Sequence, residues 1–149
     1  PRRAGLEQER GLVAARLGVL ANIELPGALP RAAIPALLAR ADLFALPSLN
    51  EAFGIVALEA RAAGLPVVAT REGGAADLVE HGSCGLLAED DADFAAQLAT
   101  LVVDATLRRR MQHAAPRDLE RYAWPAIARR HESLYAALAA APAAQRKAA

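Results

Sequence analysis

The stretch from Pro47 to Thr70, PSLNEAFGIVALEARAAGLPVVAT, decides the fold predicted for this chain. It directly follows an apolar run over residues 43–46 and closes on a second one over residues 66–69. Between the two runs lie a polar loop, a helical pattern over about residues 54–63 and a stop at Gly64. This order predicts a strand, a loop, a helix and a parallel strand. The loop then lies at the carboxyl end of a strand, where open α/β sheets bind ligands.

Strands and helices alternate on both sides of that stretch. Upstream, we predict a helix that ends at Gly18, a short strand over 23–25 and a helix over 30–40. Downstream, we predict a short helix over 75–80, a strand within 82–88, and helices over 91–103, 106–113 and 124–140. The alternation predicts a three-layer Rossmann-like α/β fold, a parallel sheet with helices on both faces. Residues 1–149 form one partial domain, with 141–149 expected to be a disordered tail.

Two of the predicted helices have clear apolar stripes. In the helix over 91–103, four residues are expected to face inward: Phe94, Leu98, Leu101 and Val102. In the helix over 124–140, the expected buried stripe is Trp124, Ile127, His131, Leu134, Tyr135 and Leu138. That is more apolar surface than a terminal surface helix usually needs. We therefore expect part of the second stripe to lack a partner within this chain.

The composition excludes several classes of protein. Lysine plus arginine equals aspartate plus glutamate at 17 each, so the formal net charge is zero and broad attraction to nucleic acid is not expected. Cys84 is the single cysteine, which excludes an internal disulfide and a cysteine-built zinc site. No apolar run approaches the roughly 20 residues that span a bilayer, and the opening PRRAGLEQER has no signal-peptide core. The expected location is cytoplasmic.

Two glutamates, Glu51 and Glu59, flank the start of the predicted helix. Unpaired backbone N–H groups at Phe53 to Val56 and the helix dipole favour an anion such as phosphate there. Ionised carboxylates accept hydrogen bonds from sugar hydroxyls, so the combination suits a nucleotide sugar. A structural explanation is also open: Ser48 to Glu51 fits a capping box, and Glu59 fits a solvated helix residue.

The same residues resemble the Glu-x7-Glu segment of the family 4 (group 1) retaining glycosyltransferases of the GT-B fold. Further similarities cover most of the chain: residues 23–27 resemble the family's Val-x-Phe-x-Gly turn, and 41–44 its Ala-Asp strand entry. Residues 73–77 resemble its Gly-Gly-x-x-Glu loop, with Asp77 in place of the glutamate, and 122–124 resemble the aromatic pair that opens its last helix.

The resemblance implies a donor-binding, C-terminal half of a retaining hexosyltransferase that needs no metal or other cofactor. Glu51 would be the catalytic-site residue that contacts and orients the donor sugar, without acting as a covalent nucleophile. Glu59 would hold the ribose, and the backbone at Leu29 would meet the base. The sugar and phosphate site would be lined by Phe53, Gly54, Ile55 and Val56. The nucleotide, whether UDP, GDP or ADP, stays open, as do the sugar, the acceptor and the linkage.

This chain also departs from the family pattern. The family's first strand of this domain, its glycine loop and its Arg and Lys diphosphate clamp precede the segment that begins at Pro1. The N-terminal acceptor-binding domain is likewise absent, and any peripheral membrane contact would be made through it. Arg2 and Arg3 are interpreted as exposed residues at a helix start, not as the clamp. We expect this chain alone to be inactive and to bind nucleotide weakly.

Two alternatives come from other classes. One is a non-catalytic nucleotide-binding or interaction module derived from the same fold. The other, a receiver-like or NAD-binding domain, has little support, because no acidic cluster follows a first strand and no G-x-G-x-x-G is present.

Overall fold

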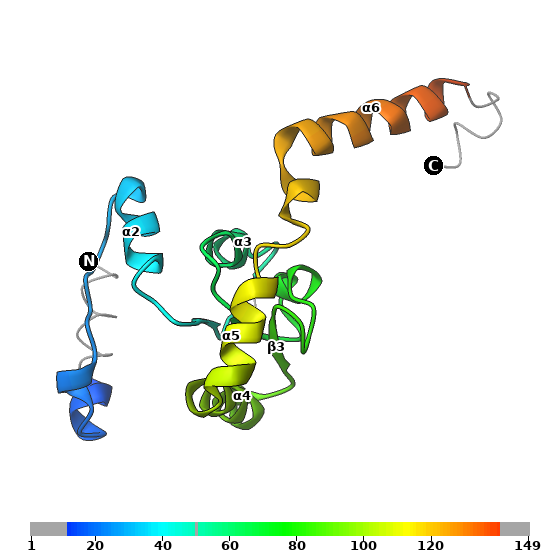
Figure 1. Ribbon diagram of the computed structural model, residues 1–149. Helices are drawn as coiled ribbons and strands as arrows, with labels where there is room; N and C mark the ends of the chain where they lie inside the picture. The colour runs from blue at the N-terminus through cyan, green and yellow to red at the C-terminus, as the bar shows by residue number, and fades with distance from the viewer. Residues whose placement is uncertain (1–11, 50, 141–149) are drawn as a thin grey trace. The chain divides into compact units, whose positions relative to one another are not determined.

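The computed structural model describes residues 12–49 and 51–140, and the chain divides into two compact units (Figure 1). The first unit comprises residues 1–37 and the second residues 38–149. The predicted tail over 141–149, together with Arg2 and Arg3, lies outside the described residues.

The first unit contains short helical segments and no strand within its described residues. Residues 12–16 are helical, and Gly18 ends this helix with a φ of +68°, as predicted. The 3-10 segments η1 Leu20–Asn22 and η2 Arg31–Ala33 follow, and α2 Ile34–Leu38 ends one residue past the unit boundary. The predicted strand over 23–25 is wrong. Ile23 has an extended backbone, but a strand forms only when its amides and carbonyls pair with a neighbour, and residues 23–25 have none in the described sheet.

The helix predicted over 30–40 is also shorter than expected. It consists of one 3-10 turn followed by the five residues of α2. Proline at position 35 is tolerated because it lies in the first turn of α2, where its missing N–H has no partner to lose.

The second unit is built on a parallel sheet with the strand order β1-β2-β3. The strands are β1 Phe44–Leu46, β2 Val67–Thr70 and β3 Gly85–Ala88. Val67 is opposite Phe44 on one side and Gly85 on the other. Every residue of β2 and β3 is buried, which explains why these strands appear as unbroken apolar runs in the sequence. The predicted parallel sheet is confirmed.

Helices surround this sheet, as expected for a Rossmann-like α/β unit. They are α3 Ile55–Ala62, η3 Gly74–Leu78, α4 Asp91–Val103, α5 Ala105–Ala114, η4 Leu119–Tyr122 and α6 Trp124–Ala140. α3 packs on β1 and β2, while α4 packs on β2 and β3. The sequence predicts α4 and α6 with both boundaries correct. Local caps explain such accuracy for α4, because the Asp90 carboxylate accepts from the Asp93 amide at 2.8 Å.

The core between the sheet and α4 and α5 consists of Val68, Leu86, Ala88, Phe94, Leu101 and Met111, with Leu43, Leu98 and Leu107 at its margin. The inward positions of Phe94, Leu98 and Leu101 are confirmed. Val102 is a wrong prediction, since 64% of its surface is exposed. At 3.6 residues per turn it lies roughly 70° from the middle of the stripe formed by the other three, beyond the reach of the sheet.

Leu101→Ala should lower the free energy of unfolding by about 2–5 kcal/mol, because it opens a cavity beside a fully buried neighbour, Met111. The adjacent Val102→Ala serves as the matched control and should change stability by less than about 0.5 kcal/mol. Urea denaturation of both variants measures the difference. Equal effects would contradict the orientation of α4.

The last helix, α6, has no buried residue. Trp124 is 82% exposed, Tyr135 64% and Leu134 54%, and Ile127 is the half-buried member of the stripe. Within the described residues of the second unit, the expectation that part of the apolar stripe lacks a partner is confirmed. The expectation that the stripe is the buried side of the helix is wrong within that unit, because most of the stripe packs on none of its described residues.

This exposed stripe predicts self-association, since contiguous apolar surface is rarely left open on a soluble monomer. The paired substitution of Leu134 and Tyr135 by serine should lower the average mass in concentration-dependent light scattering. Substituting Ala128 and Ala136 by serine, on the same helix, should leave it unchanged. A wild-type chain that stays monomeric at high concentration would contradict the prediction.

Two further findings concern the surface and the single cysteine. No helix among residues 12–49 and 51–140 is both long and apolar enough to cross a bilayer. Cys84 is buried, and its sulfur accepts a weak hydrogen bond from the Glu80 amide at 3.3 Å. Cys84 is therefore a packing residue in the turn before β3.

Candidate functional site

The loop after β1 brings Glu51 to the N-terminus of α3. One carboxylate oxygen, Oε1, accepts a hydrogen bond from the Gly54 amide at 3.1 Å. Gly54 is the N-cap of α3 and has a φ of +82°, a conformation that favours glycine. The other carboxylate oxygen of Glu51 makes no hydrogen bond within the described residues. Glu51 therefore orders this loop and still has one oxygen available.

The loop after β2 packs backbone to backbone against the Glu51 loop. The Gly74 amide donates to the Glu51 carbonyl at 2.7 Å. A Cβ at Gly74 would lie 2.5 Å from the Ala52 carbonyl oxygen, and one at Gly54 would lie 3.0 Å from Ala75. Both glycines are thus required by close approach. This explains physically why the segment 73–77 has a glycine at position 74.

A second contact ties the two loops together nearer the sheet. The Thr70 hydroxyl donates to the Ser48 carbonyl at 2.8 Å. A Cβ at Gly73 would lie 2.6 Å from the same carbonyl oxygen. The ends of β1 and β2 are therefore joined by backbone packing, and the candidate site rests on a fixed platform at the carboxyl edge of the sheet.

The first turn of α3 presents open backbone and apolar side chains. The amides of Ile55 and Val56 have no acceptor in the described part of the chain. The side chains of Phe53, Ile55 and Val56 are 50%, 58% and 36% exposed. Free amides at a helix N-terminus, beside a carboxylate, provide donors for an anion and an acceptor for hydroxyls.

The remaining predicted site residues lie in two places. Glu59 lies in the second turn of the same helix and is half-buried. Leu29 belongs to the first unit, residues 1–37, and is 36% exposed. Glu51 therefore lies in the loop that leads into α3, and Glu59 lies in α3 itself, whereas Leu29 belongs to a separately described unit.

A cavity of about 550 Å³ lies next to this loop. It is lined by Phe53, Asp77, Arg121, Tyr122, Ile127, Arg130, His131 and Leu134. The rings of Phe53 and Tyr122 meet edge to face with centroids 6.2 Å apart, and the Arg121 guanidinium lies 4.8 Å from the Tyr122 centroid. Sequence reasoning singled out Asp77 and the aromatic pair at 122–124 but not the two arginines, because their neighbours are set by tertiary contacts.

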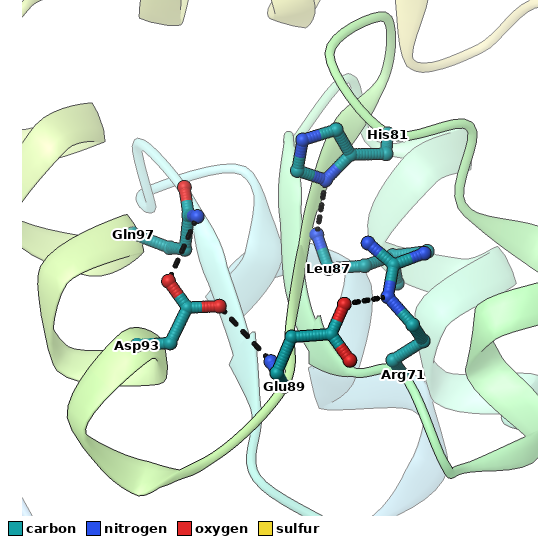
Figure 2. A network of polar contacts seen from close by, with 6 residues as sticks. All are labelled: Arg71, His81, Leu87, Glu89, Asp93 and Gln97. Atoms are coloured by element: carbon teal, nitrogen blue, oxygen red, sulfur yellow. Dashed lines mark hydrogen bonds and ion pairs between the residues drawn. The ribbon is translucent and has the colours of Figure 1, made fainter.

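A polar network at the end of β3 links side chains to the backbone around that strand (Figure 2). Arg71 forms an ion pair with Glu89, whose amide donates to Asp93 at 2.9 Å. The Leu87 amide, which points away from β2, donates to His81 Nδ1 at 3.0 Å. These contacts satisfy outward amides of the sheet edge. No group of three or more metal-ligating side chains exists among the described residues.

Comparison with known proteins assigns the family. The sequence profile of the family "Glycosyl transferases group 1" matches residues 5–118, more than half of the 149 residues. The chain belongs to the group 1 glycosyl transferases. A similar relative, a D-inositol 3-phosphate glycosyltransferase of Corynebacterium jeikeium, is 41% identical over 134 residues, which are 88% of this chain and 32% of the relative. A second relative with the same name, from Corynebacterium urealyticum, is 38% identical over 95% of this chain and 34% of its own length.

Solved structures support the same fold for this group 1 chain. HepE of Anabaena, crystallised with UDP and glucose, superposes with a TM-score of 0.68 at 33% identity over 76% of this chain and 31% of HepE. The C-terminal domain of LpcC from Francisella tularensis gives a TM-score of 0.70 at 27% identity, covering 80% of this chain and 62% of that domain. The unit is therefore the GT-B type of Rossmann-like α/β domain. The chain spans about a third of the length of the curated relatives it matches.

Proposed function

We propose that this chain is most of the donor-binding domain of a glycosyltransferase that moves a sugar from a nucleotide diphosphate to an acceptor hydroxyl. The observation that carries the proposal is the Glu51 loop. It combines a carboxylate with one oxygen available and the open amides of Ile55 and Val56 at the same helix start. Structures similar to this chain include one of HepE with UDP and glucose, which supports a nucleotide-sugar donor.

Within this proposal each part of the loop has a defined task. Glu51 accepts a hydrogen bond from a donor-sugar hydroxyl and orients the sugar, a hexose, for transfer with retention. Glu59 accepts from the ribose hydroxyls, and the backbone at Leu29 meets the base. The amides over Phe53 to Val56 donate to the diphosphate, whose charge grows as the bond to the sugar breaks.

The proposed reaction needs no metal. The charge of the departing diphosphate is met by helix-terminal amides and by an Arg and Lys pair in the part of the protein that precedes this chain. The acceptor binds to an N-terminal domain, through which the protein contacts the membrane periphery. The reaction takes place in the cytoplasm.

The test is a transfer assay with the protein at its natural length. UDP-, GDP- and ADP-glucose serve as donors, and D-inositol 3-phosphate is one acceptor because two relatives carry that name. We expect transfer from one of the donors, with no loss in EDTA. Nucleotide binding without transfer to any acceptor would favour the non-catalytic module instead. Dependence on a divalent cation would contradict the metal-free mechanism.

The 149-residue chain on its own should show no transfer and only weak nucleotide affinity. Each charge-assisted contact to a diphosphate is worth about 1.5–3 kcal/mol, so two missing clamp residues weaken binding by about two orders of magnitude or more. Calorimetry with nucleoside diphosphates measures this affinity. Sub-micromolar binding would show that the described residues already hold a complete phosphate site.

A further inference from the structure

Arg61 is a buried cation with no carboxylate beside it. Only 4% of its surface is exposed, and it forms no ion pair among the described residues. Its Nε donates to the Ala115 carbonyl at 3.0 Å, and its terminal nitrogens donate to the carbonyls of Leu78 at 2.5 Å and Arg117 at 2.8 Å. A buried charge is costly unless it is hydrogen-bonded, and here three backbone dipoles replace both water and a counter-ion.

Two of the three carbonyls belong to the chain that leaves α5. Ala115 directly follows α5, whose C-terminal carbonyls carry partial negative charge that favours a cation. Arg117 precedes Asp118, which has a φ of +59° and is the one non-glycine residue with positive φ in the described ranges. Arg61 therefore holds the chain at the entrance to a left-handed turn.

Both segments bound by Arg61 continue to the Glu51 loop. Leu78 ends η3, and η3 begins at Gly74, whose amide donates to the Glu51 carbonyl. The turn at Asp118 leads into η4, which ends at Tyr122 beside Phe53. One guanidinium on α3 thus fixes two walls of the candidate site without touching the loop itself.

We propose that Arg61 is a positioning residue of the donor site, where its guanidinium sets η3 and the turn at Asp118 against the Glu51 loop. This inference rests on the proposed donor-binding function. Arg61 touches no donor, because its side chain is buried and bound to carbonyls. Its removal lets both walls relax, so the site loses affinity for the donor, while binding of the acceptor, which we place on another domain, is unaffected.

The test compares two arginines that make the same kind of contact. Arg108 also donates to carbonyls at a helix end, those of Leu101 at 2.6 Å and Val102 at 2.9 Å, but it borders neither η3 nor the Glu51 loop. In the protein at its natural length, Arg61→Lys and Arg61→Met should raise the donor dissociation constant by about tenfold or more. Arg108→Met should leave it within about twofold, although it too lowers the melting temperature. The KM for the acceptor should stay unchanged in all three.

A second measurement separates positioning from general stability. Arg61→Lys keeps the positive charge and the aliphatic part of the side chain, so this variant should fold more readily than Arg61→Met. It replaces the planar guanidinium by a single ammonium group, which cannot reach all three carbonyls in the same geometry. Hydrogen exchange at the Gly74 amide should be faster in Arg61→Lys than in Arg108→Met. Methylguanidinium should restore donor affinity to Arg61→Ala and have no effect on Arg108→Ala.

Two results would overturn the inference. One is a folded Arg61→Lys protein with wild-type donor affinity and wild-type exchange at Gly74. The other is equal weakening of donor binding by Arg61→Met and Arg108→Met. A wild-type protein that binds no nucleotide sugar would refute the proposed function instead, and the exchange rate at Gly74 would then still decide whether Arg61 positions the loop.

Discussion

Glu51→Gln should reduce the transfer rate of the natural-length protein by about 100-fold or more while leaving its fold intact. Glutamine keeps an oxygen that accepts from the Gly54 amide, so the loop and the start of α3 retain their geometry. What is lost is the negative charge on the oxygen that accepts no hydrogen bond from the described residues. Charge-assisted hydrogen bonds are about twice as strong as neutral ones, and losing one aimed at the transition state costs about two to three orders of magnitude.

Two further variants show whether the loss of activity in Glu51→Gln comes from the charge of Glu51. Glu80→Gln removes an exposed carboxylate beyond η3 and should leave both kcat and KM unchanged. Glu51→Ala removes the hydrogen bond from the Gly54 amide as well as the charge, so it should also lower stability by about 1 kcal/mol. Near-normal kcat and KM in Glu51→Gln would show that Glu51 has the purely structural role that its bond to Gly54 also permits.

Gly85→Ala should produce the largest loss of stability among single-methyl additions to this sheet. A Cβ at Gly85 would lie 2.1 Å from the carbonyl oxygen of Val67, its partner on β2, and 2.8 Å from the Val79 side chain. The carbonyl belongs to the central strand and moves only if β2 and β3 separate. Overpacking of this kind costs about 3 kcal/mol or more, a large part of the roughly 5–15 kcal/mol that stabilises a domain.

Gly82→Ala is the matched control for that experiment. Gly82 lies three residues earlier, in the turn that precedes β3, with a φ of +82°, and a Cβ added there would have no atom within 4 Å. Alanine at this position introduces only backbone strain, which lowers the free energy of unfolding by about 1–2 kcal/mol. Thermal denaturation of both variants should therefore show the larger drop for Gly85→Ala. A larger drop for Gly82→Ala would mean that β3 does not pack on β2 in the observed register.

The helices α4 and α5 could be predicted from the sequence because their N-terminal limits are set locally. Asp90 and Asp104 cap α4 and α5 with their own carboxylates, a contact between residues two or three positions apart. The strands β2 and β3 could be predicted because complete burial requires an unbroken apolar run. The family could be predicted because the Glu51 loop keeps a fixed order of carboxylate, glycine and helix start.

Other features depend on tertiary contacts, which no local sequence pattern predicts. Residues 23–25 have the composition of a strand, yet they form none in the described sheet, since pairing needs a neighbour distant in sequence. The stripe on α6 predicted an apolar face correctly, but whether that face is covered depends on what packs against it.

The sequence by itself determined the parallel α/β unit, the family and the position of the Glu51 loop, because these rest on local periodicity, caps and a contiguous motif. Only the tertiary structure decided how that loop is held. Gly74 touches Ala52 and Glu51 from the next loop along the chain, and Arg61 binds carbonyls 17, 54 and 56 positions away. Charge and size are properties of a residue, whereas the carbonyls that surround a buried guanidinium are brought together only by the folded chain.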